Sequence, residues 1–362
     1  MKVRISPSKI DWPFLTAVFF LVAFGILMVF DASSVSAVTQ FNNKYYFAKE
    51  QLKGVIVGFI GLIVAACFDY RKFYKLSVPL ILLCLVLLIL VFLPGLGVKA
   101  MGAHRWIDFK FFILQPSELT KLAVVIYLSA WLSQKEKGRF AAFLLLVALI
   151  VGLVVLEPDM GTAFVLVFIS VIIYFISGSP LVQFLLIIPG IIVGGLWLAV
   201  AAPYRFNRIL TFFNPSADPL GTSYHVRQIL IALGSGGFWG LGLGKSRQKF
   251  AYLPEASTDS IFAIIAEELG FVGATLVIMV FIFIIYKGYT ISKNAPDKFG
   301  KLLAFGITTW LALQVIVNLS SMVALTPLTG IPLPFISYGS SSLAVILFAI
   351  GILINIDRQK KI

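Results

Sequence analysis

Charge is scarce in this sequence, and so are cysteine and histidine. Charged residues make up 12% of the 362 residues and hydrophobic residues 60%, a balance that excludes a water-soluble domain of this size. The two cysteines, Cys67 and Cys84, lie inside apolar stretches, where burial as small hydrophobic side chains is favoured over a disulfide or a metal site. Because histidine and cysteine form no cluster, we expect no permanent metal cofactor.

Long apolar stretches fill the chain instead. A membrane-spanning helix needs roughly 20 mostly apolar residues, and we identify such spans at residues 12–31, 54–68, 76–94, 114–133, 140–156, 160–177, 181–202, 260–286, 302–324 and 340–356. The first is too long for the apolar region of a secretory signal, so we expect no cleavage after it. The sequence predicts an all-α polytopic membrane protein of about ten transmembrane helices, with residues 1–362 as a single domain.

Basic residues alternate between the loops and predict the orientation. An even number of spans puts both termini on one side of the membrane. Lysine and arginine are frequent near both termini and in the loops around Arg71, Lys135 and Lys287. By the positive-inside rule, this face is cytoplasmic. Residues 203–259 then form a long extracytoplasmic loop.

The opposite face nevertheless carries cations, among them Arg205, Arg208 and Lys249 in the long loop. Long loops are translocated regardless of charge, so topology alone can tolerate these residues. As a group they also suggest an outer anion site, because arginine and lysine suit phosphate recognition. Both interpretations stay open.

The same loop contains an amphipathic segment and a glycine-rich run. Residues 224–233 have the apolar spacing of a helix that lies in the membrane interface. The glycines of residues 234–244 resemble a nucleotide-binding loop only superficially, because no strand precedes them. We therefore expect neither a nucleotide nor a nucleic acid as a partner.

Polar residues interrupt the apolar pattern in the fourth span and before the sixth. Glu118 and Lys121 are one helical turn apart, so they either neutralise each other or contact a substrate. Glu157 and Asp159 flank a proline between the fifth and sixth spans. There a tight turn, with Asp159 capping the next helix, is the favoured interpretation.

Carboxylates also gather at the start of the eighth span. Asp259 lies in the predicted first turn at the outer interface, four residues after Glu255. It either interacts with the helix N-terminus or takes part in chemistry. Glu267 and Glu268 lie deeper in the span, where ionised carboxylates need partners, and Lys121 is a candidate partner.

A loop with three prolines, residues 326–342, leads into the tenth span and includes Ser337. Repeated proline prevents a continuous helix there. Irregular backbone at membrane depth is tolerated only where protein or a cavity surrounds it. Together with the carboxylates and cations, this loop predicts an outward-facing cavity.

These residues form motifs that resemble the SEDS family (shape, elongation, division and sporulation) along essentially the whole chain, and most closely its FtsW and SpoVE branch. The resemblance rests on Gln115–Lys121, Glu157–Thr162, Pro203–Arg208, Asp218–Gly221, Leu253–Asp259, Glu267–Gly270 and Gly330–Gly339. The family pattern has His-Thr-Asp-Phe where this chain has Ser257-Thr258-Asp259-Ser260, and the aspartate is retained.

The resemblance implies a ten-helix fold and a peptidoglycan glycosyltransferase of the bacterial cytoplasmic membrane that polymerises lipid II with inversion. It also implies work beside a class B penicillin-binding protein and other divisome proteins, in septal cell-wall synthesis. Asp259 would be catalytic, either as the base or as the ligand of a transient Mg²⁺ or Mn²⁺. We expect substrate contacts from Glu118, Lys121, Arg205, Arg208, Lys249, Glu255 and Ser337.

Two other functions fit part of the pattern. A lipid II flippase could use the polar groups of the fourth and eighth spans as a pathway. A non-catalytic division scaffold would explain the helices but not the outer acids and cations. The unusual chemistry lies in the outer loops, which favours the enzyme.

Overall fold

The computed structural model describes residues 11–93, 97–100, 103–110, 112–134, 138–201, 206, 210, 212–213, 223–250 and 252–360. Its helices are α1 (Trp12–Phe41), α2 (Tyr46–Cys67), α3 (Lys72–Leu90), α4 (Pro116–Ser133), α5 (Phe140–Leu156), α6 (Met160–Ile176), the 3₁₀ helix η1 (Leu181–Gln183), α7 (Phe184–Val200), α9 (Tyr224–Gly236), α10 (Ile261–Asn294), α11 (Lys298–Met322) and α12 (Ser340–Arg358).

Each predicted span coincides with a helix, so the predicted helical membrane fold is confirmed. Within the described residues, seven helices are long and apolar enough to cross a membrane: α1, α2, α3, η1 with α7, α10, α11 and α12. The apolar helices α5 and α6 have 17 residues each. Helix α4 has 18 residues and buries two charged side chains. The orientation in the membrane stays a prediction.

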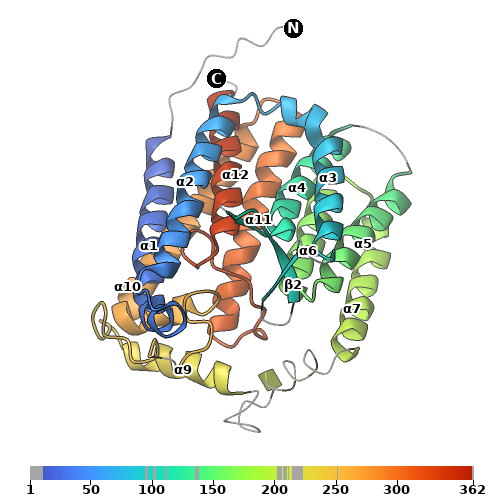
Figure 1. The fold of residues 1–362 in the computed structure, drawn as a ribbon. Coiled ribbons are helices and arrows are strands. Elements are labelled where there is room, and N and C mark those ends of the chain that lie inside the picture. The colour runs from blue at the N-terminus through green and yellow to red at the C-terminus, as the bar shows by residue number, and fades with distance from the viewer. Residues whose placement is uncertain are drawn as a thin grey trace.

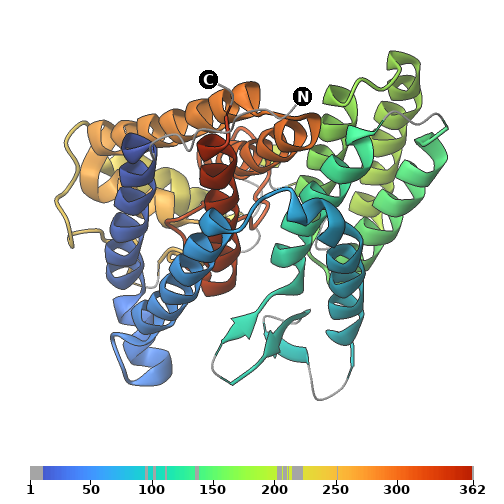
Figure 2. The ribbon, with the colours of Figure 1, turned by 90° about the horizontal axis from the view of Figure 1, so that it is seen from above.

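Helices α11 and α12 form the centre of the bundle. Their membrane-span windows are 78% and 89% buried, against 6% for η1 and α7. Figure 2 shows them between α1 and α10 on one side and α4 to α7 on the other. Helix α7 lies at the edge, so it can bound a groove without belonging to the core.

A small antiparallel sheet follows α3, and the sequence did not predict it. Its strands are β1 (Gly97–Ala100), β2 (Ala103–Asp108) and β3 (Ile113–Leu114), in the order β1-β2-β3. Strand β2 pairs with both neighbours, and Ile107 lies opposite Leu114. The sheet ends at Leu114, and α4 begins two residues later at Pro116.

Helix α9 confirms the predicted amphipathic segment. It lies across one end of the bundle, opposite the end at which α1 begins and α12 finishes (Figure 1). We call this the α9 end. Helix α9 packs closely on α10, because a Cβ atom at Gly236 would lie 2.1 Å from the carbonyl oxygen of Ala266.

Helix α10 is broken at Gly270. This residue has φ +68° and ψ −169°, a conformation that favours glycine. The first part, from Ile261 to Glu268, is buried along its whole length. Around the break, Leu241 and Gly242 donate backbone hydrogen bonds to the carbonyls of Glu267 and Glu268 at 3.0 and 2.9 Å. The glycine-rich run thus satisfies the backbone of a broken helix.

Candidate active site

Asp259 lies at the α9 end, immediately before the N-cap residue of α10. It is 9% exposed. The hydroxyl of Thr258 lies 2.7 Å from Glu255 Oε2 and 3.3 Å from Asp259 Oδ1, so it is within hydrogen-bond reach of both carboxylates. The sequence prediction of Asp259 and Glu255 at a helix start is therefore matched by their placement side by side.

Glu255 titrates differently from an ordinary glutamate. Burial raises its pKa, and the nearby charge of Asp259 raises it further, while the Thr258 hydroxyl and His225 act in the opposite direction. The backbone of Glu255 is left-handed, with φ +51°. Because the charges of Asp259 and Glu255 have the same sign, the two carboxylates repel each other, and a cation or a proton between them would be stabilised.

Ser337 holds this segment in place. Its hydroxyl donates to the carbonyl of Thr258 at 2.5 Å and accepts from the backbone N–H of Leu333 at 2.8 Å. The neighbouring Tyr338 N–H donates to the carbonyl of Ser257 at 2.8 Å. In this structure the hydroxyl of Ser337 joins the proline loop to the Asp259 segment, and its predicted substrate contact stays a prediction.

Asn318 is a second anchor, which the sequence analysis missed. Its side chain is fully buried in α11, and its Nδ2 donates to the carbonyls of Asp259 and Ile331, both at 2.8 Å. An amide inside a predicted span is costly to bury without partners. That signal was present in the sequence and could have identified it.

Lys249 belongs to a buried cluster with Asp31 and Glu268. Its ammonium nitrogen lies 2.7 and 2.9 Å from the two carboxylate oxygens of Asp31 and 3.0 Å from Glu268 Oε1. The residue is 7% exposed. Two carboxylates already bind the charge of Lys249, and its predicted substrate contact stays a prediction. Asp31 was not singled out in the sequence.

Glu267 and Glu268 organise the loop that contains Lys249. Glu268 accepts backbone hydrogen bonds from Gly244 and Ser246 at 3.0 Å each, and Glu267 accepts one from Arg247 at 3.1 Å. The Ser246 hydroxyl also donates to Glu267. Both glutamates therefore have partners from the loop that precedes α10.

Lys121 pairs with Glu118, 2.7 Å away, and both side chains are almost fully buried. Its ammonium also lies 5.5 Å from the ring centroid of Trp310, a cation–π distance. The predicted link from Lys121 to Glu267 or Glu268 is therefore wrong. Glu118 and Lys121 form the ion pair that the neutralising alternative describes, and their predicted substrate contacts stay predictions.

The turn between α5 and α6 has the predicted cap and an isolated acid. Asp159 accepts from the N–H of Thr162 at 3.0 Å and so caps α6. Glu157 is fully buried, and its carboxylate has no hydrogen-bond partner among the described residues. Burial, together with the charge of Asp159, raises the pKa of Glu157 to about 8. Arg105 donates to the carbonyls of Glu157 and Pro158.

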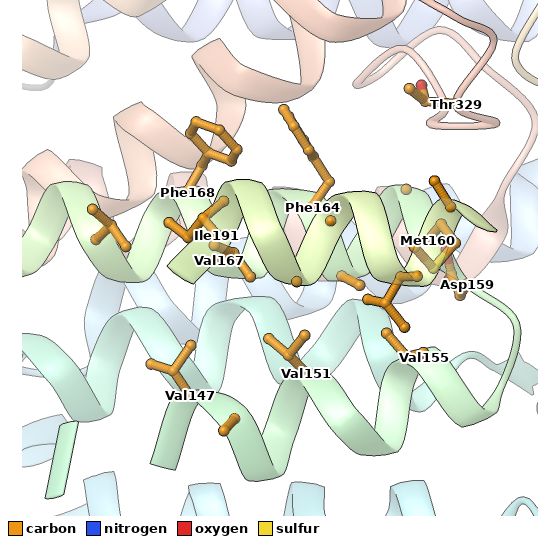
Figure 3. Close-up of a pocket in the computed structure, with 18 of the residues that line it drawn as sticks. Val147, Val151, Val155, Asp159, Met160, Phe164, Val167, Phe168, Ile191 and Thr329 are labelled. Carbon is orange, nitrogen blue, oxygen red and sulfur yellow. The ribbon is translucent and has the colours of Figure 1, made fainter. Parts of the chain in front are cut away.

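An apolar groove of about 760 Å³ opens between α5, α6 and α7. Figure 3 shows Val147, Val151 and Val155 along α5, with Asp159 and Thr329 at one end. Three glycines of α7 line the groove and would place a Cβ atom in open space: Gly190, Gly194 and Gly195. The groove therefore combines a long apolar wall with a polar mouth at which Arg105 also lies.

Direct contacts connect the mouth of this groove to Asp259. A Cβ atom at Gly161 of α6 would lie 2.7 Å from the carbonyl oxygen of Thr329. Two residues further along, the carbonyl of Ile331 shares the Asn318 side chain with the carbonyl of Asp259. The proline loop thus touches the groove mouth on one side and the Asp259 segment on the other.

Two predicted substrate ligands, Arg205 and Arg208, lie outside the described residues. Within the part of the chain that the structure describes, no group of three or more histidine, cysteine, aspartate or glutamate side chains could hold a metal ion. Asp259 and Glu255 supply two carboxylates, and Mg²⁺ binds through one or two carboxylates with water and phosphate as its other ligands. This pair therefore fits a cation that arrives with a phosphorylated substrate.

The sequence matches the cell cycle protein family of FtsW, RodA and SpoVE over residues 12–362. It is 40% identical to stage V sporulation protein E of Bacillus subtilis, covering 94% of this chain and 95% of that protein. It is 39% identical to a probable peptidoglycan glycosyltransferase FtsW of Trichlorobacter lovleyi, covering 98% and 95%.

Two solved structures share the fold. A chain of a peptidoglycan synthase complex that coordinates polymerization and crosslinking has a TM-score of 0.79 and 26% identity, over 97% of this chain and 98% of that chain. The rod shape determining protein RodA of Thermus thermophilus has a TM-score of 0.71 and 26% identity, again over 97% and 98%.

Proposed function

This chain belongs to the FtsW, RodA and SpoVE family of cell cycle proteins, and we propose that Asp259 carries its chemistry. It is a peptidoglycan glycosyltransferase and a multi-pass protein of the bacterial inner membrane. The observation that supports the assignment of the site is the pair of the buried Asp259 and the half-buried Glu255, fixed at the α9 end by side chains from several elements.

The reaction joins the 4-hydroxyl of one lipid II sugar to the anomeric carbon of another. The new bond forms as the bond from that carbon to the undecaprenyl pyrophosphate breaks, and the hydroxyl proton goes to a base. Asp259 is the proposed acceptor of that proton. If a divalent cation binds, Asp259 and Glu255 hold it, and it supplies positive charge for the leaving pyrophosphate.

The groove between α5 and α7 suits the hydrocarbon chain of the substrate. Its walls are apolar, and the chain of a lipid-linked sugar needs an apolar path that leaves the head group at the surface. Arg105 and the hydroxyl of Thr329, which has no hydrogen-bond partner among the described residues, lie at the mouth. These donors suit a phosphate oxygen. Lipid II would thus lie with its pyrophosphate near the proline loop.

Sidedness supports an outer active site. The α9 end is extracytoplasmic if the basic loops near both termini are cytoplasmic. The proposed partner is a class B penicillin-binding protein, and the proposed setting is septal wall synthesis with other divisome proteins. The similar chain in a complex that coordinates polymerization and crosslinking supports such a partner.

A flippase would need the polar groups of α4 and α10 as a path for the head group. Glu118 and Lys121 are instead buried against each other, and Glu267 and Glu268 bind the loop that precedes α10. The observed pairing therefore favours the transferase over the flippase.

The test is glycan-chain formation from labelled lipid II by purified wild-type protein and by Asp259→Asn, each with its partner. Asparagine has nearly the size of aspartate, and its side-chain oxygen can still accept from the Thr258 hydroxyl, so the variant should fold and melt like wild type. We expect polymerisation to fall by about a hundredfold or more. A folded Asp259→Asn protein that polymerises at the wild-type rate would exclude the catalytic role.

A further inference from the structure

Ser260, the N-cap residue of α10, does not cap its own helix. An N-cap serine normally accepts a hydrogen bond from the second or third N–H of its helix. The side chain of Ser260 makes no such bond. Its hydroxyl lies 2.7 Å from Nε2 of His225, which is 35 residues earlier and belongs to α9. The start of α10 therefore lacks a local side-chain cap and is connected to another helix instead.

This connection reaches the peptide next to the proposed catalytic residue. Ser260 is fully buried and follows Asp259 directly. Its N–H donates to the carbonyl of Glu255 at 3.2 Å, and its carbonyl accepts from Ala263 at 3.0 Å. Because the peptide bond is planar and stiff, a displacement of Ser260 is passed to Asp259.

Three side chains fix this segment from three elements. Asn318 of α11 binds the carbonyl of Asp259, and Ser337 of the proline loop binds the carbonyl of Thr258. His225 of α9 binds the side chain of Ser260. The first two act before or at Asp259, and His225 acts after it. With both sides held, the backbone that carries the Asp259 side chain is fixed.

We propose that His225 is a positioning residue for Asp259, which it orients by holding Ser260. The proposal depends on the catalytic role given to Asp259 above. A histidine suits this task because either ring nitrogen can donate or accept, depending on the tautomer, and a serine hydroxyl can do both. The half-buried imidazole also lies close enough to Glu255 to act on its charge.

Docking of α9 does not require His225. Ile229 and Ala232 of the same helix are buried, and Gly236 packs directly on the backbone of Ala266. Truncation of His225 should therefore leave α9 in place and affect mainly the geometry at Ser260. This difference separates a positioning role from a purely structural one.

The experiment measures kcat and KM for lipid II polymerisation, with the partner present, for His225→Ala, His225→Gln, Ser260→Ala and the double variant His225→Ala with Ser260→Ala. Leu230→Ala is the control, because Leu230 lies on the same helix and is 42% exposed. Melting temperatures of all variants are recorded. Asp259→Asn is assayed in the same series.

We expect His225→Ala to lower kcat by roughly tenfold to a hundredfold, since a misplacement of about 1 Å can have that effect. KM and the melting temperature should stay close to those of wild type and of Leu230→Ala. His225→Gln should recover most of the rate, because its amide can still bond the serine hydroxyl. The double variant should be no slower than the slower single variant, because both changes break the same contact.

Wild-type kcat in a folded His225→Ala protein would overturn the proposal, as would losses that multiply in the double variant. If His225→Ala does not fold, the rate of His225→Gln is compared with that of Ser260→Ala. Equal losses of rate in these two variants would overturn the proposal. Activity in Asp259→Asn equal to wild type would refute the catalytic role itself. An inactive Asp259→Asn beside a fully active His225→Ala would refute only the positioning role.

Discussion

Replacing Lys249 by methionine would leave two carboxylates of the membrane domain without their shared cation. The substitution keeps an unbranched apolar side chain as far as Cε but removes the ammonium group, which binds Asp31 and Glu268. The Glu268 side chain is fully buried, and that of Asp31 is 24% exposed. Lys249→Met should therefore destabilise the fold, because water cannot replace the lost cation at Glu268.

The size of the effect follows from the burial of the pair. Removal of one partner from a buried ion pair costs about 3 to 5 kcal/mol, and the partial exposure of Asp31 favours the lower value. At about 2.1 cal/mol/K per residue, a chain of 362 residues has an unfolding entropy of about 0.76 kcal/mol/K. A loss of about 3 kcal/mol then lowers the melting temperature by about 4 °C.

The assay is thermal unfolding in detergent, followed by tryptophan fluorescence. Lys245→Met is the matched control, because Lys245 is an exposed lysine of the same loop. The double variant with Asp31→Asn should recover part of the loss, since it removes one of the two stranded charges while Gly244 and Ser246 still bind Glu268. The reasoning is refuted if Lys249→Met melts with the control, or if the double variant is less stable than Lys249→Met alone.

Three further perturbations test other parts of the molecule. Gly194→Leu should fill the groove and raise KM for lipid II without a change in the melting temperature. Gly152→Leu, on a face of α5 with open space but outside the groove, should change neither KM nor the melting temperature. Glu157 keeps its proton in the folded state up to about pH 8 but loses it near 4.5 when unfolded, so melting temperatures should fall as pH rises through this window, and Glu157→Gln should flatten the profile. Gly270→Ala should prevent stable folding, detectable as lost monodisperse protein, because its Cβ atom would lie 2.3 Å from the nitrogen of Gly240.

Hydropathy predicted where the chain crosses the membrane better than where its helices end. Helix α1 was predicted to end at residue 31 and continues to Phe41. The segment after Asp31 is less apolar, but it contains no proline or glycine to stop a helix. The length of an apolar run corresponds to the thickness of the hydrocarbon core of the membrane, whereas hydrogen bonding and capping determine where a helix ends.

The sheet escaped prediction for a related reason. Its longest strand has 6 residues, and β3 has only 2. Strands this short have too few alternations to be distinguished from a loop. These strands are defined by their pairing with each other, which a window along the sequence does not detect.

In the site, the sequence identified the residues that needed partners but not the partners themselves. Burial of Glu268 in a predicted span is unfavourable without a partner, and this property is visible in the sequence. Its cluster includes Lys249, which was predicted as a substrate contact in the long loop, and Asp31, which is 218 residues from Lys249. Packing of α1 against α10 brings them together, and no local pattern encodes that contact. Asp159, whose partner is three residues away, was predicted correctly.

The backbone bonds from the 244–248 segment to Glu267 and Glu268 impose an order on biosynthesis. The loop leaves the ribosome before the glutamates that its N–H groups bind, and at about 5 to 20 residues per second the delay is about 1 to 5 s. During this interval the loop lacks the carboxylates that its N–H groups bind. Its shape can be acquired only when the first part of α10 is in place, so a defect in the placement of α10 would be observed as a misfolded loop before it.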